Sequence, residues 1–112
     1  MTTSIRLVLL TLLFFGFAAG SSALAQTSHQ WQQMRNAMVD TEIVDAGVKD
    51  PRVISAMRAT PRHEFVARTE RQRAYLDMAL PIGAGQTISP PFIVAYMTEQ
   101  LEPSASDKVL EI

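Results

Sequence analysis

The residues best suited to chemistry lie between positions 79 and 91, in the stretch ALPIGAGQTISPP. Two glycines in it, Gly83 and Gly85, let the backbone approach a ligand closely because they carry no Cβ atom. Ser89 precedes two prolines and suits the N-cap of a helix, since the missing N–H of a proline leaves no bond unmade in the first turn. The pattern predicts an active-site loop that leads into a helix.

Taken alone, each of these features also has a simpler interpretation. A serine at this position is more often a structural cap than a catalytic group, and a Gly-x-Gly sequence is an ordinary turn. The loop lacks the lysine and the spacing of a phosphate-binding loop. Asp77 and Glu99, on either side of it, are most simply a loop residue and a helix-surface residue.

Histidine and cysteine offer no alternative chemistry. His29 and His63 lie far apart without the spacing of metal ligands, so we expect each to be a surface or loop histidine. Nothing in the sequence places either of them beside Ser89, and a Ser-His-Asp triad is not predicted. The chain has no cysteine, which excludes a disulfide framework and a thiolate metal site, and no metal is predicted.

The helix that positions Ser89 should extend over residues 90–101. Its apolar residues recur at spacings of three and four, which predicts that they lie on the buried side of the helix. They are Phe92, Ile93, Tyr96, Met97 and Leu101.

Two further helices are predicted upstream. The first has Ser28 as N-cap and ends at Gly47, a natural C′ residue, and the second begins at Asp50-Pro51 and ends before Pro61. Their apolar positions are Trp31, Met34, Met38, Val39, Ile43 and Ala46 in the first helix and Val53, Ile54 and Met57 in the second. The part of the chain before the loop is therefore predicted to be mostly helical.

Three short segments complete the pattern. Phe65 and Val66 are expected to anchor a third, short segment. The charged stretch over residues 68–73 predicts a solvated face, and the functional alternative is that its arginines, Arg68, Arg71 or Arg73, flank an acidic peptide substrate. Residues 109–112 are apolar except for Glu111 and follow Asp107-Lys108, which is typical of the first buried strand of a parallel sheet.

The first 25 residues have the pattern of a secretory signal peptide. Arg6 precedes an apolar run from Leu7 to Gly20, and Ala23-Leu24-Ala25 forms a small-residue cleavage site before Gln26. We expect export to the periplasm, cleavage after Ala25 and no stable association with the membrane afterwards. The alternative is an uncleaved anchor, although the apolar run is short for crossing a bilayer.

Length and charge limit the remaining possibilities. A chain of 112 residues makes at most one small domain. The formal net charge of −1 gives no electrostatic argument for a nucleic-acid partner. No internal repeat or low-complexity tract is present, and a monomer is expected.

Several ordered groups of residues resemble one known family. The groups are Ala79-Leu80-Pro81-Ile82-Gly83, Gly85-Gln86-Thr87-Ile88-Ser89, Pro91 and Met97-Thr98-Glu99, with further matches at Met38-Val39, Gly47, Arg52-Val53, Ala56-Met57, Pro61-Arg62, Phe65-Val66, Ala74-Tyr75, Asp77 and residues 108–112. In them the chain resembles the protein-L-isoaspartate O-methyltransferases, from about Met34 to Ile112. One departure is Pro90, where relatives more often carry Gln or Ala and thus a backbone donor.

The resemblance implies a fold, a reaction and a set of site residues. The fold is α/β, with a helical and substrate-loop region over residues 26–106 and, over residues 107–112, the first strand of a Rossmann-like methyltransferase domain, truncated after it. The reaction moves a methyl group from S-adenosylmethionine to the carboxylate of L-isoaspartyl or D-aspartyl residues in damaged proteins.

By the same resemblance, Gly83, Ala84, Gly85 and Gln86 help to cover the cofactor, whose main binding loop would lie beyond Ile112. Thr87, Ile88 and Ser89 face the isoaspartyl group, with Ser89 as the catalytic residue. The 112-residue fragment is expected to be inactive alone. The competing hypothesis is an exported, non-catalytic helical module in which the same loop binds peptides.

Overall fold

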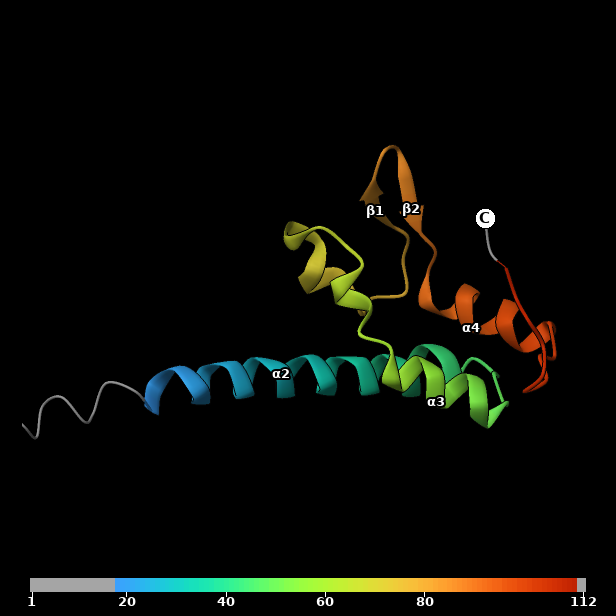
Figure 1. Ribbon diagram of the computed structural model, residues 1–112, viewed down its shortest axis with the longest axis horizontal. Helices are drawn as coiled ribbons and strands as arrows, with labels where there is room; N and C mark the ends of the chain where they lie inside the picture. Colours follow the sequence, from blue (N-terminus) through green and yellow to red (C-terminus); the bar gives the residue numbers. More distant parts are fainter. Residues whose placement is uncertain (1–17, 111–112) are drawn as a thin grey trace, which may run out of the picture. The chain divides into compact units, whose positions relative to one another are not determined.

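The computed structural model describes residues 18–110 of the chain and divides it into two compact units, Met1–Gln32 and Gln33–Ile112. Most of the predicted leader and the last two residues of the predicted C-terminal strand lie outside the described residues. Figure 1 shows the helices and the single hairpin. None of the described helices is long and apolar enough to cross a membrane.

The first described helix, α2, comprises Ala18–Met38 and begins well before Ser28. Ser28 is therefore not an N-cap, and that prediction was wrong. The residues before it include several alanines and a leucine, which favour continued helix. The chain then forms the π-helix η1, Val39–Val44, and leaves the helical path at Gly47, whose φ of 110° confirms it as the terminating residue.

The second predicted helix is present as α3, Pro51–Ala59. Asp50 is its N-cap, and the carboxylate accepts a hydrogen bond of 2.8 Å from the N–H of Arg52. The helix ends before Pro61, as predicted, because a proline disfavours helical backbone at the residue before it.

Two short 3-10 helices follow, η2 over Arg62–Glu64 and η3 over Arg68–Arg73. Between them Val66 is buried, whereas Phe65 is 59% exposed, so only one of the two expected anchors enters the core. No residue of η3 is buried, which agrees with the predicted solvated face.

The glycine-rich loop is the tip of an antiparallel hairpin. Strand β1, Leu80–Gly83, pairs with β2, Gln86–Ile88, and Ala84 and Gly85 form the turn. This hairpin is the whole of the sheet within residues 18–110. Val109 and Leu110 are exposed and form no strand, because an isolated segment has no neighbour to bond with.

The helix after the hairpin, α4, comprises Pro91–Gln100 (Figure 1). Its buried residues are Pro91 and Ala95. The predicted buried side was wrong: Met97 and Leu101 are 62% and 69% exposed, and Ile93 and Tyr96 are also exposed. The small residue Ala95, rather than the large apolar side chains, packs inward, which lets α4 lie close to α3 and η1.

The core lies within the Gln33–Ile112 unit, where α3, α4 and η1 pack against one another. Its buried apolar residues are Met38, Val39, Ile43, Val48, Val53, Val66, Ala74, Tyr75, Leu80 and Ala95. The hairpin thus begins at a buried residue, Leu80, and leads into the packed helix α4. Both ends of the predicted active-site loop are held in this way.

Candidate functional site

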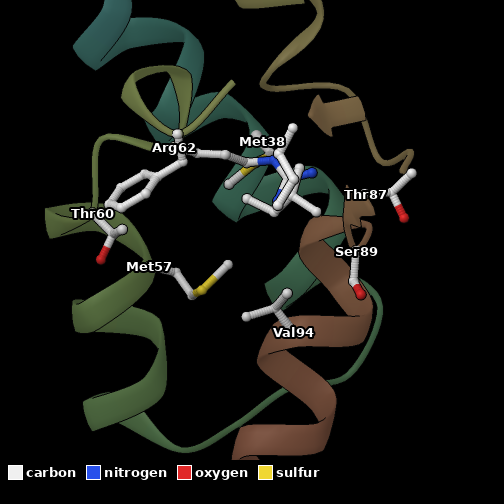
Figure 2. Close-up of a pocket in the computed structure, with 10 residues that line it drawn as sticks. Met38, Met57, Thr60, Arg62, Thr87, Ser89 and Val94 are labelled. Carbon is white, nitrogen blue, oxygen red and sulfur yellow. The ribbon is translucent and has the colours of Figure 1, made fainter. Parts of the chain in front are cut away.

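A cavity of about 360 Å³ lies between the hairpin and the helices of the Gln33–Ile112 unit. In Figure 2, Met57 from α3 and Val94 from α4 point toward each other across it, and Thr87 and Ser89 stand on the side of the hairpin. The lining residues are Met38, Met57, Thr60, Arg62, Phe65, Ile82, Thr87, Ile88, Ser89 and Val94. The wall is mostly apolar, with three hydroxyl groups and one cation.

All three residues predicted to face a substrate line this cavity: Thr87 and Ile88 at the end of β2, and Ser89 in the link to α4. Thr87 and Ser89 are exposed, and Ile88 is half-buried. Sequence reasoning did not assign a role to Arg62. A signal was present, because Pro61-Arg62 is one of the pairs that resemble the methyltransferase family.

The residues predicted to cover a cofactor lie elsewhere. Gly83, Ala84, Gly85 and Gln86 are exposed at the hairpin tip, and none of them lines the cavity. Gly83, Ala84 and Gly85 have φ values of 106°, 50° and 72°. A Cβ added at either glycine would meet no atom within 4 Å, so the tip is open to an approaching ligand.

The start of α4 differs from the sequence prediction in one important respect. Pro90, not Ser89, is the N-cap, and its carbonyl accepts the first helical bond from the N–H of Val94. The N–H of Phe92 donates to Asp77 Oδ1 at 2.9 Å, so a residue 15 positions earlier satisfies the helix end. Among the described residues the hydroxyl of Ser89 has no hydrogen-bond partner, which leaves it available to a ligand.

Asp77 and Glu99 both do more than the simple interpretations assigned to them. One oxygen of Glu99 accepts hydrogen bonds from the backbone N–H groups of Lys49 and Asp50, both at 2.6 Å. This contact joins the C-terminal part of α4 to the start of α3. Together, Asp77 and Glu99 hold α4 near both of its ends and so fix the helix that follows Ser89.

Arg62 is a buried cation at the cavity, with only 6% of the residue exposed. Its Nε and Nη2 donate hydrogen bonds to the carbonyl oxygens of Ala74 and Met78, at 2.8 and 3.1 Å. Burial lowers the pKa of the guanidinium, and the negative charge of Asp77 acts in the opposite direction. Arg62 therefore joins the cavity wall to the segment that leads into the hairpin.

His63, next to Arg62, is buried, which corrects the prediction of a surface or loop histidine. Its Nδ1 lies 2.6 Å from the hydroxyl of Tyr75, which also accepts a hydrogen bond of 3.3 Å from Arg35 Nη1. Burial lowers the pKa of His63; the charge of Glu64 acts in the opposite direction, and the charges of Arg71 and Arg35 lower the pKa further. His29 is exposed, as predicted, and within residues 18–110 no cluster of acidic and histidine side chains could hold a metal ion.

Comparison with known proteins identifies the family. A family model described as protein-L-isoaspartate(D-aspartate) O-methyltransferase matches residues 32–112. The chain therefore belongs to this family of methyltransferases.

Relatives with curated names have the same designation. The chain is 54% identical over 78 residues to "Protein-L-isoaspartate O-methyltransferase 2" of Pelobacter propionicus, covering 70% of this chain and 35% of the relative. It is 55% identical over 78 residues to the Geobacter metallireducens enzyme, with 70% and 36% covered. For the Shewanella sediminis relative the identity is 44% over 103 residues, with 92% and 42% covered. The chain thus spans less than half the length of these relatives.

Proposed function

We propose that this chain supplies the substrate-binding part of a protein-repair methyltransferase that acts on L-isoaspartyl or D-aspartyl residues. The observation that carries the proposal is that Thr87, Ile88 and Ser89 line one cavity, in a chain that belongs to this family. The unpartnered hydroxyl of Ser89 is a donor for a carboxylate. Isoaspartyl-containing proteins and peptides are the proposed partners, and a monomer is the proposed state.

The proposed cofactor is S-adenosylmethionine, which supplies an activated methyl group on a sulfonium. The exposed backbone of Gly83, Ala84, Gly85 and Gln86 would lie over it, since the space around these glycines is open. We assign its main binding loop to the part of the relatives that this chain does not match. The fragment alone is therefore proposed to be inactive.

The task of these residues is placement rather than acid–base chemistry, because a carboxylate is already a nucleophile at neutral pH. Ser89 would donate a hydrogen bond to the carboxylate and hold it in line with the methyl group. Such orientation can lower a barrier by about 7 kcal/mol or more. The dipole of α4 contributes less than expected to binding of the substrate carboxylate, because the N–H of Phe92 already donates a hydrogen bond to the carboxylate of Asp77.

A chimeric protein tests this function. In it, the matching part of the Geobacter metallireducens relative is replaced by the corresponding part of this chain. We expect the chimera to methylate an isoaspartyl peptide and not the same peptide with a normal aspartyl residue. This chain alone should methylate neither. A folded chimera that shows no preference for the isoaspartyl peptide would contradict the proposal.

The second candidate is a non-catalytic peptide-binding module. It is favoured by one observation: the cavity is formed within the described residues and needs none of the four hairpin-tip residues proposed to cover a cofactor. If this chain binds the peptide and the chimera is inactive, the result would favour the peptide-binding module. An active chimera would select the enzyme.

A further inference from the structure

Arg62 has hydrogen-bonding capacity that the protein does not use. An arginine presents five N–H donors, of which the structure pairs one on Nε with Ala74 and one on Nη2 with Met78. Nη1 has no partner among the described residues. Among the described residues, the only fully enclosed side-chain nitrogen or oxygen without a partner is Arg71 Nε, so Arg62 Nη1 is not fully enclosed by protein.

The charge of Arg62 is also incompletely compensated. Burying a cation is costly unless an anion lies against it. Asp77 is near enough to act on the Arg62 charge, but within residues 18–110 the two form no ion pair, and Asp77 already accepts from Phe92. No acidic residue lines the cavity. Arg62 is therefore a buried cation in the cavity wall that is held by two carbonyl groups and has no ion pair among the described residues.

The surroundings of Arg62 favour a carboxylate on a partly apolar ligand. Met38, Met57 and Val94 make part of the cavity wall apolar, and apolar surroundings strengthen a charge-assisted hydrogen bond. In Figure 2, the side chain of Arg62 extends across the cavity lining to a position beside Met38.

We propose that Arg62 Nη1 is the principal anchor for the carboxylate of the isoaspartyl residue, with Ser89 as an auxiliary donor. The inference rests on the proposed function for the identity of the ligand. It adds a consequence for turnover, because methylation would convert the anionic carboxylate into a neutral ester and remove the ion pair with Arg62. The site would therefore hold substrate more tightly than product, and Arg62 would favour product release.

The experiment uses one peptide in two forms: the acid, which has a free isoaspartyl carboxylate, and the methyl ester of that carboxylate. The affinity of the 112-residue chain for each form is measured by calorimetric titration. We expect the acid to bind about tenfold or more tightly than the ester. In Arg62→Met this preference should fall to about one. The control is Lys49→Met, which removes an exposed cation outside the cavity and should keep the preference.

Arg62→Met also removes two structural hydrogen bonds, so a second measurement uses the unaltered protein. The ¹⁵N resonances of the Arg62 guanidinium should move when the acid is added and stay in place with the ester. If the acid leaves them unchanged, or Arg62→Met folds and retains the preference, the proposal is wrong. A preference that survives Arg62→Met but is lost in Ser89→Ala would assign the anchor to Ser89 instead.

A third peptide, with a normal aspartyl residue, separates this proposal from the proposed function. Selection of the isoaspartyl over the aspartyl peptide without an acid-over-ester preference would overturn the role of Arg62 alone. An Arg62-dependent preference for the acid, equal for both peptides, would support the carboxylate site and contradict isoaspartyl selectivity. Absence of binding by every peptide would overturn both.

Discussion

Ser89 illustrates how one residue can keep its proposed chemical role while losing its structural one. The sequence suggested that this serine caps the following helix, but Pro90 is the cap residue and Asp77 satisfies the N–H of Phe92. The Ser89 hydroxyl therefore contributes little to the stability of α4. Its effects on activity and on folding can be separated experimentally.

We predict that Ser89→Ala leaves the stability of the chain unchanged, although loss of a real N-cap costs about 1 kcal/mol. In the chimeric enzyme the same change should lower turnover by about tenfold or more, because a hydrogen bond to the carboxylate is lost. Urea unfolding and methylation of an isoaspartyl peptide measure the two effects. The Ser89→Asp variant should fold normally, and its turnover should be lower still, because the introduced carboxylate repels the carboxylate of the substrate. Near-parental activity of Ser89→Asp would contradict a role for Ser89 in binding.

A second prediction concerns the buried pair of His63 and Tyr75. Burial lowers the pKa of His63, so the folded protein favours the neutral ring. Above the ordinary histidine pKa of about 6.5, the ring is neutral in both the folded and the unfolded chain, and the stability is fully present. As the pH falls below that value the unfolded chain takes up a proton first, and the free energy of unfolding should decrease. Urea titrations at intervals of about half a pH unit, between about pH 7.5 and pH 5, measure this change.

His63→Asn provides the control, because an amide can accept a hydrogen bond from the Tyr75 hydroxyl but does not titrate. Its stability should vary less between these pH values than that of the unaltered chain. An equal loss of stability in both proteins would assign the effect to other groups.

At the scale of secondary structure, the accuracy of sequence reasoning depended on the range of each interaction. The caps at Asp50 and Gly47 involve residues within a few positions, and both were predicted correctly. The partners of Asp77 and Glu99 lie 15 and about 50 positions away, and no local pattern could reveal them. Arg62 belongs to a residue pair that resembles the family, but its contacts with Ala74 and Met78, 12 and 16 positions away, could not be predicted from that pair.

The hairpin was missed for a related reason. The sequence between Leu80 and Ile88 was interpreted as a glycine-rich active-site loop, and strands of only four and three residues are too short to show a clear alternating pattern. The turn itself is unusual, since Ala84 has a φ of 50° beside Gly85 at 72°. Positive φ at both central positions is the backbone of a type I′ turn, which favours Asn-Gly over Ala-Gly.

We therefore predict that Ala84→Asn stabilises the hairpin. The left-handed conformation costs an ordinary residue about 1 kcal/mol, and asparagine tolerates it better than alanine. Amide hydrogen exchange of β1 and β2 should slow, with the free energy of unfolding rising by about 0.5–1 kcal/mol. Gly85→Ala, at the neighbouring positive φ, should have the opposite effect. Faster exchange in Ala84→Asn would exclude this interpretation of the turn.

At the scale of the whole molecule, the leader remains a prediction, because most of it lies outside the described residues. Signal cleavage after Ala25 would leave a mature N-terminus at Gln26. Mass spectrometry of the natively expressed, soluble protein measures this directly. Detection of Met1 in that fraction would contradict cleavage, and recovery of the uncleaved chain with the membrane would favour the anchor.

The contact of Glu99 with the amides of Lys49 and Asp50 has a consequence for the order of folding. It joins residues 50 and 49 positions apart, so the loop it closes contains α3, both 3-10 helices and the hairpin. Closing such a loop costs entropy that local helices and turns do not have to overcome. The cavity wall on α4 should therefore assemble late, after α3 and the hairpin have formed, and its rate of formation should set the folding rate of this unit.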